Sequence, residues 1–242
     1  MNKNMLIGKN ITKKYGDNIV LEDVDVVIER GKITTLIGPS GSGKTTLLRV
    51  MSLLDHSDSG TISIDGSDYQ HPAEGEDAIL PWPKISVVFQ QLFLWPHLTL
   101  RQNILLPLSG DKDLSHMEEL LTMFDMNEFI DRYPNQASLG QRQRTALVRA
   151  LVLEPEYLLL DEITSALDIE QVAVVLKHLQ MLRDKGVGIL IVTHLLNFAQ
   201  RASDQIVFLD HGRVLEAGGK EVLTKPKHER IKKFLSIIES AS

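Results

Sequence analysis

The chain contains no cysteine in its 242 residues, which excludes disulfides and thiol chemistry and fits a reducing compartment. Long hydrophobic runs are also missing. The N-terminal stretch MNKNMLIGKN has only three strongly apolar residues in a row, too few for the core of a signal peptide. No later run approaches the length that spans a bilayer. These absences predict a soluble chain in the cytoplasm.

The sequence also lacks an excess of positive charge. It has 26 Lys and Arg against 32 Asp and Glu, for a formal net charge of -6. Such a chain has no general electrostatic attraction to the phosphates of DNA or RNA, so we expect no nucleic-acid partner. Its 43% hydrophobic and 24% charged residues are typical of a globular protein. We therefore expect one compact domain with two lobes.

The first third of the chain is predicted to consist of short strands joined by tight turns. These strands are expected at residues 5–15, 24–29, 32–37, 61–66 and 84–89. The stretch from Ser67 to Pro83 is rich in proline, glycine and acidic residues and is expected to be an exposed loop. Its function cannot be deduced from its composition.

Helical patterns occupy residues 99–154 and predict an inserted helical lobe. In a capping box, a hydroxyl and an amide or carboxylate three residues later satisfy the free amides of a helix start. Three pairs have this spacing: Thr99 with Gln102, Ser115 with Glu118, and Ser138 with Gln141. Pro155 is expected to end the last helix of the lobe.

Buried strands return after the helical lobe. Residues 157–161 and 187–194 read as strands covered on both faces, and a helix is expected between them at residues 170–184. Residues 205–218 are expected to form a hairpin, followed by short amphipathic helices from Lys220 onward. This alternation indicates an α/β fold with a mainly parallel core sheet. The N-terminal strands and the late hairpin indicate an antiparallel flank.

The stretch GPSGSGKTT fits the phosphate-loop pattern of glycine, four residues, glycine, lysine and a hydroxyl residue. Its glycines let backbone amides approach a polyphosphate closely, and the helix that begins here adds its positive dipole end. Lys44 is expected to reach the β- and γ-phosphates, and Thr45 to hold Mg²⁺. A glycine turn before a surface helix is the alternative, which the strand–loop–helix context disfavours. The residues predicted to bind ATP here are Gly38, Pro39, Ser40, Gly41, Ser42, Gly43, Lys44, Thr45 and Thr46.

Two carboxylates end the expected strand YLLLDE. Side chains alternate between the faces of a strand, so Asp161 and Glu162 are expected to have different tasks. We assign Asp161 to Mg²⁺ and Glu162 to the attacking water. Such a pair alone is more often a solvated strand end. After a phosphate loop, it becomes the expected second half of a nucleotide site.

These residues together resemble the nucleotide-binding subunit of ATP-binding cassette (ABC) transporters, and the resemblance covers nearly the whole chain. It implies a RecA-like P-loop NTPase fold in a single ABC ATPase domain, residues 1–242. Residues 1–90 and 155–242 would form the nucleotide-binding core. Residues 91–154 would form the helical subdomain.

The resemblance also implies roles for residues outside the phosphate loop. Tyr15 would stack on adenine, although without the resemblance a buried strand tyrosine would be the better interpretation. Gln90 would touch Mg²⁺ and signal to a membrane partner, with Gln91 as the adjacent alternative. Asp168, in the stretch SALD, matches the aspartate loop and would join the nucleotide site. His194 matches the switch histidine, a role taken from the family because a lone histidine at a strand end is usually structural.

The family's signature, Leu-Ser-Gly-Gly-Gln, corresponds here to ASLGQ. Ser138, Gly140 and Gln141 match, and the resemblance implies that they offer a helix start to ATP held by a second subunit. Ala137 and Leu139 differ from the signature. We expect the side chain of Leu139 to crowd the nucleotide or to require an altered φ, at about 1–3 kcal/mol if strained. Slow or conditional hydrolysis would follow.

The resemblance further implies two copies, or one copy and a similar subunit, closing head to tail around two ATP molecules. Glu162 would orient water, Lys44 and Mg²⁺ would stabilise charge, and His194 would hold the γ-phosphate. Transmembrane permease subunits would dock near QLFLWPHLTL, and a substrate-binding protein is expected as a further partner. The chain would then be peripheral on the inner face of the membrane. Alternatively, Phe93 and Trp95 only anchor the helical lobe.

The stretches VVFQQLFLWPHLTLRQNI and LTKPKHERIKKFL resemble the subunits of bacterial polar amino-acid importers, so amino-acid import is the expected function. The helical lobe between Ile104 and Tyr133 is shorter than usual there, and Ile163 replaces the family's usual proline. One alternative is a regulatory module with weak hydrolysis, which Ala137 and Leu139 would favour. Others are an export or lipid-trafficking ATPase, and a soluble ABC protein, which the single cassette disfavours.

Overall fold

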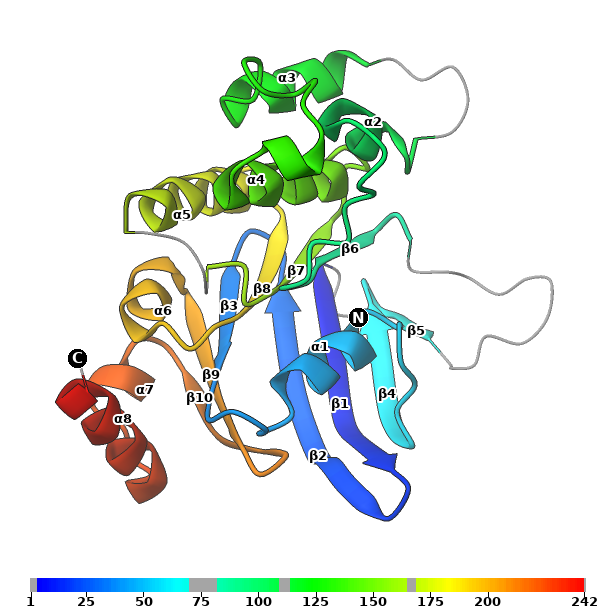
Figure 1. Cartoon of the computed structure of the whole chain (residues 1–242). Helices are drawn as coiled ribbons and strands as arrows, with labels where there is room; N and C mark the ends of the chain where they lie inside the picture. The colour runs from blue at the N-terminus through cyan, green and yellow to red at the C-terminus, as the bar shows by residue number, and fades with distance from the viewer. Residues whose placement is uncertain (1–3, 70–81, 109–113, 165–168, 242) are drawn as a thin grey trace.

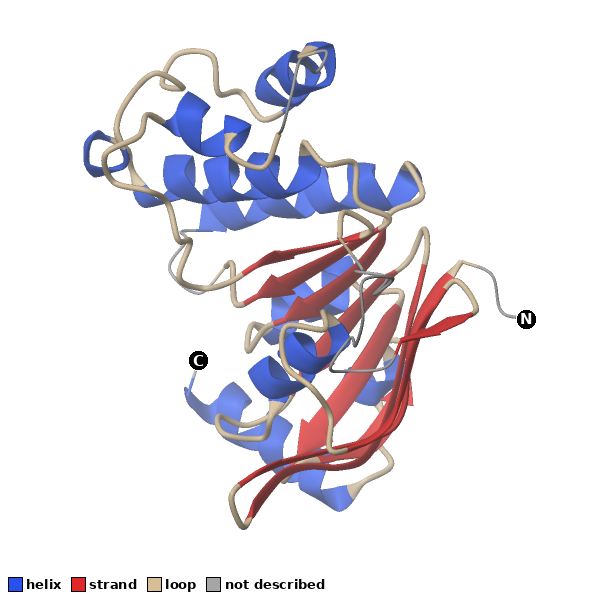
Figure 2. Ribbon diagram, turned by 90° about the vertical axis from the view of Figure 1, so that its right-hand side faces the viewer, coloured by secondary structure: helices blue, strands red, loops and turns tan. Residues whose placement is uncertain are grey.

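Two sheets and a helical lobe form the molecule in this computed structural model, which describes residues 4–69, 82–108, 114–164 and 169–241. Figures 1 and 2 show the helical lobe at one end, with both sheets below it. The stretch SALD, with Asp168, and the middle of the loop expected from Ser67 to Pro83 lie outside the described residues.

The N-terminal strands form an antiparallel sheet in the order β2-β1-β4-β5. Its strands are β1 Met5–Tyr15, β2 Asn18–Glu29, β4 Ser59–Ile64 and β5 Ser67–Tyr69. A tight turn joins β1 to β2, where Tyr15 pairs with Asn18 and Gly16 has a φ of 59°. Glycine adopts this left-handed conformation without a Cβ clash and so permits the tight turn. Because the turn is tight, β2 begins earlier in the chain than the sequence predicted. The expectation of a loop from residue 67 is wrong for β5, which pairs with β4.

The second sheet has six strands in the order β10-β9-β3-β8-β7-β6. Its strands are β3 Ile33–Ile37, β6 Ile85–Val88, β7 Tyr157–Asp161, β8 Gly188–Val192, β9 Gln205–Asp210 and β10 Arg213–Gly218. Every neighbouring pair is parallel except β9 and β10, which form the expected hairpin. The mainly parallel core sheet with an antiparallel flank is thus confirmed, except that β9 itself belongs to the parallel part.

The helices are α1 Lys44–Met51, α2 Leu100–Leu105, α3 Ser115–Met123, α4 Leu139–Leu151, α5 Ile169–Asp184, α6 Leu196–Ala202, α7 Glu221–Thr224 and α8 Glu229–Ala241. The capping boxes expected at Thr99 and Ser138 are present. The third expectation is wrong, because Leu114 occupies the N-cap position and Ser115 is already helical. The short helix α6 was not expected from the sequence, and it packs through Phe198, Ala199 and Ala202.

Alternate residues of the central strands face two different hydrophobic cores. In β7, Leu158 and Leu160 pack with the helices α2 to α6. Tyr157 and Leu159 pack with α1 and the antiparallel sheet. Each strand is therefore covered on both faces, which explains why its sequence is continuously apolar. Both the phosphate loop and the acid pair then lie at the carboxyl ends of buried central strands.

Two polar residues of the helical lobe form hydrogen bonds with the segment that follows β6. The Asn103 side chain is fully buried, accepts from the Trp95 amide at 2.7 Å and donates to carbonyls of Trp95, Leu98 and Thr99 at 2.9–3.2 Å. From α4, Arg149 donates to the carbonyls of Leu92 and Phe93 at 2.7 and 2.8 Å. This segment is thus held largely by its backbone, and Phe93 and Trp95 keep their side chains exposed while Leu92 and Leu94 pack against the core.

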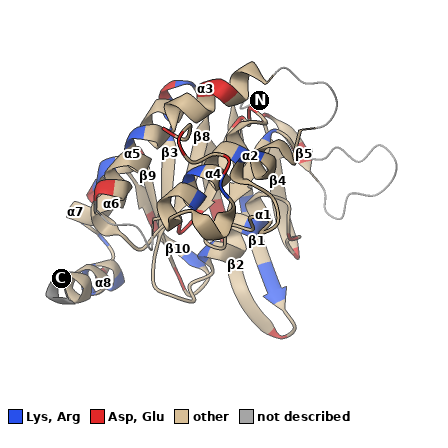
Figure 3. Ribbon diagram, turned by 45° about the horizontal axis from the view of Figure 1, so that its top comes forward, with Lys and Arg blue, Asp and Glu red and all other residues tan. Residues whose placement is uncertain are grey.

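Acidic and basic residues are interspersed along the ribbon in Figure 3. Mixed signs of this kind agree with the modest net charge of -6. Among the described residues, none of the helices has the length and apolar character needed to cross a membrane.

We predict that Asn103→Ala lowers the free energy of unfolding by about 2–3 kcal/mol, because buried amide and carbonyl groups around Trp95 and Thr99 lose their partner. Chemical denaturation measures this change. Asn135→Ala, at an exposed position, is the matched control and should shift stability by less than about 0.5 kcal/mol. Equal losses in the two variants would contradict the anchoring role.

Candidate functional site

The phosphate-loop residues lie between β3 and α1, as expected from their sequence, with the turn of the β9–β10 hairpin beneath them. A Cβ on Gly38 would lie 1.9 Å from the carbonyl oxygen of Leu209, and one on Gly43 would lie 2.8 Å from that of Val20. The Gly212 amide donates to the Ser42 carbonyl at 3.1 Å. Only glycine permits such close approach, so the phosphate loop packs directly against the backbone of β9 and β2.

Lys44 is held at the loop by the loop's own backbone. Its ammonium donates to the carbonyls of Gly38 and Pro39 at 3.0 and 2.7 Å, and the residue is only 8% exposed. Burial lowers the pKa of Lys44, and nearby Glu162 and Asp161 act in the opposite direction. The buried Ser42 hydroxyl has no hydrogen-bond partner among the described residues. A concentrated set of donors beside a glycine cradle fits a polyphosphate.

Thr45 and Asp161 come together at the start of α1 and the end of β7. The threonine hydroxyl donates to the Asp161 carboxylate at 3.3 Å. Burial raises the pKa of Asp161, with a smaller opposing effect of the Thr45 hydrogen bond. A hydroxyl and a carboxylate are oxygen ligands of the kind that Mg²⁺ takes beside substrate phosphates. The donor set of this pair therefore fits the ion expected from the sequence.

Glu162 and His194 approach each other from neighbouring strand ends. His194 Nδ1 lies 3.6 Å from Glu162 Oε2, and the Glu162 amide donates to the Val192 carbonyl at 2.9 Å. Glu162 has a φ of 49°, a left-handed conformation that few non-glycine residues adopt and that is found at functional sites. Both side chains are partly exposed, so they are accessible to water and to a ligand.

Gln90 is exposed just beyond β6, which pairs in parallel with β7, so it lies near the strand end that carries Asp161. Its neighbour Gln91 is also exposed. Asp168 lies outside the described residues, and its role remains a prediction.

Tyr15 is 48% exposed, so the alternative of a buried strand tyrosine is wrong. Its hydroxyl donates to Asp55, and the Lys13 ammonium lies 5.0 Å from the centre of its ring. The hydrogen bond to Asp55, followed by burial, raises the pKa of Tyr15. Sequence analysis missed Lys13 and Asp55, because Asp55 is 40 positions from Tyr15 and no short motif includes both.

Ser138 is exposed at the N-terminal tip of helix α4, where the helix begins. Its hydroxyl accepts from the Gln141 amide at 3.2 Å, and the Gln141 side chain accepts from the Ser138 amide at 2.9 Å. Leu139 is the first residue of the helix and has ordinary helical backbone, so the expectation of an altered φ is wrong. A Cβ on Gly140 would lie 3.1 Å from Gln171, which shows how closely α5 approaches the tip.

Gln143 is a further polar residue that the sequence did not single out. Its side chain is 6% exposed and donates to the Ile163 carbonyl at 2.6 Å. Ile163 directly follows Glu162 and is itself buried. Gln143 lies about one turn of α4 beyond Ser138. Its hydrogen bond therefore links this helix to the backbone beside Glu162, the carboxylate proposed to activate water.

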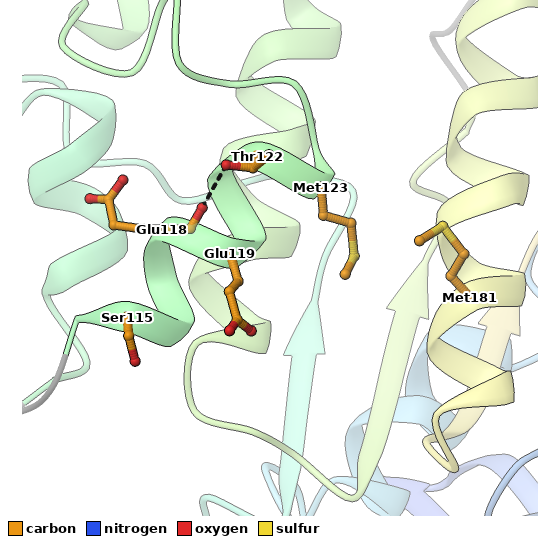
Figure 4. A pocket seen from close by; sticks show the side chains of 6 residues that line it. All are labelled: Ser115, Glu118, Glu119, Thr122, Met123 and Met181. Carbon is orange, nitrogen blue, oxygen red and sulfur yellow. Dashed lines mark hydrogen bonds between the residues drawn. The ribbon is translucent and has the colours of Figure 1, made fainter.

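A hollow of about 740 Å³ on the helical lobe is separate from this site. Its side chains come from α3 and α5, and Figure 4 shows Met123 and Met181 pointing toward each other across it. Glu118 and Glu119 add acidic groups to its wall. Carboxylates and thioethers suit no polyphosphate, so the nucleotide chemistry belongs to the sheet edge and not to this hollow.

The family model described as "ABC transporter" matches residues 21–165, a range that includes the phosphate loop, the acid pair and the serine tip. The chain belongs to the ABC transporter family. It is therefore an ATP-binding and ATP-hydrolysing transporter subunit, as the sequence predicted. The RecA-like P-loop fold with helices and both kinds of sheet is also confirmed.

Two similar transport proteins align with nearly the full length of this chain. The glutamine transport ATP-binding protein GlnQ of Escherichia coli is 39% identical over 96% of this chain and 98% of its own. The L-cystine import ATP-binding protein TcyC of Bacillus subtilis is 38% identical over 97% of this chain and 98% of its own. A dimeric structure of the ATP-binding cassette MJ0796, bound to ADP and phosphate, superposes with a TM-score of 0.78 at 32% identity.

We predict that Gly38→Ala destabilises this ABC subunit by about 3 kcal/mol and abolishes ATP binding, because the new Cβ would collide with the Leu209 carbonyl. Thermal unfolding without nucleotide measures the first effect. Gly41→Ala is the matched control: its φ is 77°, but nothing lies within 4 Å of a Cβ there. It should cost only about 1–2 kcal/mol. A smaller loss for Gly38→Ala than for Gly41→Ala would refute the close-approach argument.

Proposed function

We propose that this ABC subunit powers the import of a polar amino acid. The observation that carries the proposal is the assembly at one sheet edge of the Lys44 cradle, the Thr45–Asp161 pair and the Glu162–His194 pair. Relatives whose names specify glutamine and L-cystine transport support the direction and the class of solute. The solute itself would be selected by other chains of the transporter.

The residues of the site have distinct proposed roles. Backbone amides of the glycine loop and the Lys44 ammonium bind the phosphates of ATP, and Tyr15 stacks on the adenine. Thr45, Asp161 and Gln90 hold Mg²⁺, which would neutralise charge on the β- and γ-phosphates. Asp168, in the stretch SALD, is proposed to contact the nucleotide.

Glu162 orients the attacking water and accepts its proton, and His194 positions both Glu162 and the γ-phosphate. A partly exposed carboxylate with a histidine nitrogen 3.6 Å away has the access and the partner that these tasks need. The Lys44 side chain, which lies near Glu162 and Asp161, stabilises negative charge on the phosphoryl group as it is transferred.

We further propose that two such subunits close head to tail, so that each Ser138 tip completes the phosphate site of the partner. The exposed tip presents the Gly140 amide and the Ser138 hydroxyl, which accepts from the Gln141 amide, at the positive end of the 13-residue helix α4, to an anion. The Gln143–Ile163 hydrogen bond would then transmit closure to the backbone beside Glu162. In this arrangement, residues 1–242 work as a single domain, with residues 91–154 as its helical part.

The permease is proposed to dock at a groove of about 450 Å³ between the helical lobe and the sheets. Trp82, Phe89 and Leu153 are among the residues that line it, and Phe93 packs edge-on against Phe89. Phe93 is 58% exposed, so its side chain extends the apolar rim while Arg149 holds its backbone; Trp95, in the same segment, is 54% exposed. Docking there would place the chain on the inner face of the membrane, beside a permease that receives solute from a binding protein.

We predict that Lys44→Ala lowers the ATPase rate of the transporter complex by at least about 100-fold, because the phosphoryl group loses its cation. Glu162→Gln should lose turnover to a similar extent but retain ATP and trap a dimer, which light scattering detects. Tight ATP binding by the unaltered chain with no turnover, even with the permease present, would instead indicate a regulatory module.

We also predict that Phe93→Ser reduces transport by the reconstituted complex about tenfold, because the permease loses part of an apolar contact. ATP binding by the isolated subunit should not change. Ile237→Ser on α8, at a side chain 54% exposed, is the matched control and should leave transport unaltered. Full transport by Phe93→Ser would exclude the groove as the docking surface.

A further inference from the structure

Lys13, Asp55 and Tyr15 form a closed cluster in which each side chain contacts the other two. The Lys13 ammonium lies 3.1 Å from Asp55 Oδ1, and the Tyr15 hydroxyl donates to the other oxygen of the same carboxylate. The Lys13 ammonium also lies over the Tyr15 ring, 5.0 Å from its centre. One lysine thus meets both the anion and the aromatic ring, as in cation–π recognition.

The three side chains differ sharply in exposure. Lys13 is 3% exposed and the Asp55 side chain 15%, whereas Tyr15 is 48% exposed. A nearly buried ammonium requires a charged partner, and Asp55 supplies it. The buried pair therefore forms the base of the cluster, and the ring of Tyr15 rests on it with a large part of its surface open to solvent.

Backbone contacts fix the position of this base relative to the phosphate loop. The Asp55 amide donates to the Arg49 carbonyl at 3.2 Å, just beyond the end of α1. From the same segment, Asp58 bonds both the Thr12 carbonyl and the Lys14 amide of β1, at 2.8 and 2.6 Å. The helix that begins with Lys44 and the strand that ends with Tyr15 are thereby joined through the segment that carries Asp55.

We propose that Lys13 and Asp55 are positioning residues that hold the Tyr15 ring as a preformed platform for the adenine of ATP. This inference rests on the proposed stacking role of Tyr15. With its hydroxyl tethered and one face covered by the lysine, the ring presents its open face to the base. Binding then costs little side-chain entropy, because the ring is already ordered before ATP arrives.

The test compares ATP with inorganic tripolyphosphate, which has the phosphates but no base. Calorimetry on the full chain, with Mg²⁺ present, gives the affinity for each ligand. Asp55→Ala and Lys13→Met should each weaken ATP binding about fivefold, because the aromatic stack loses its order. Their affinity for tripolyphosphate should stay unchanged. Tyr15→Phe removes only the tethering hydroxyl and should weaken ATP binding about twofold to threefold.

Two outcomes would overturn the inference: equal weakening of both ligands, which means that the pair supports the phosphate loop, and no weakening of either. Lys32→Met is the matched control, since it breaks an exposed lysine–carboxylate pair with Glu29 at the opposite end of β3. It should leave both affinities unaltered.

Tyr15→Ala separates this inference from the proposed stacking role. It should weaken ATP binding, and Asp55→Ala should add no further loss in that background, because the two changes remove one coupled unit. If Tyr15→Ala leaves ATP binding intact, the stacking role itself is wrong. If Tyr15→Ala weakens ATP binding and Asp55→Ala does not, only the positioning role is wrong.

Discussion

The nucleotide site depends on the hydrogen bonds between the nearly buried Lys44 ammonium and the backbone of its own loop. Such a charge is costly to bury unless polar partners surround it, and here the carbonyls of Gly38 and Pro39 surround Lys44 at 3.0 and 2.7 Å. The loop can offer these carbonyls only because its glycines allow a tight path over the Leu209 carbonyl. The phosphate cradle is therefore shaped by packing from β9 and β2 as much as by its own motif.

Parallel pairing of the central strands gathers the remaining groups at one edge. Leu36 of β3 and Asp161 of β7 both lie opposite Val192 of β8, so the three strands end at the same level. Loops that follow these strands bring Thr45, Glu162 and His194 to the same edge, which is the usual ligand-binding edge of an open α/β sheet. Sheet register, rather than proximity in sequence, thus assembles a site from residues that span most of the chain.

The helical lobe carries the serine tip that we propose to complete the phosphate site of a second subunit. Its serine tip is capped internally and exposed, which suits contact with a second subunit better than contact with its own phosphate loop. Leu139 departs from the family signature yet takes ordinary helical backbone, so the departure introduces no local strain. Gln143 and Arg149, on the same helix, bond the backbone near Glu162 and the segment after Gln90, respectively. Helix α4 therefore connects the three regions that a transport cycle would have to coordinate.

The sequence by itself determined the phosphate loop, the acid pair, the buried strands and two of the three helix caps, because each depends on spacings of a few residues. It misplaced the cap at Ser115, where Leu114 precedes the helix, and it did not indicate α6 or β5, which are too short to show a clear period. Only the tertiary structure brought Lys13 and Asp55 beneath Tyr15 and joined Arg149 to Phe93, 56 positions away. Contacts between residues so distant in sequence depend on how the helices and strands pack against one another, and no local sequence pattern specifies that packing.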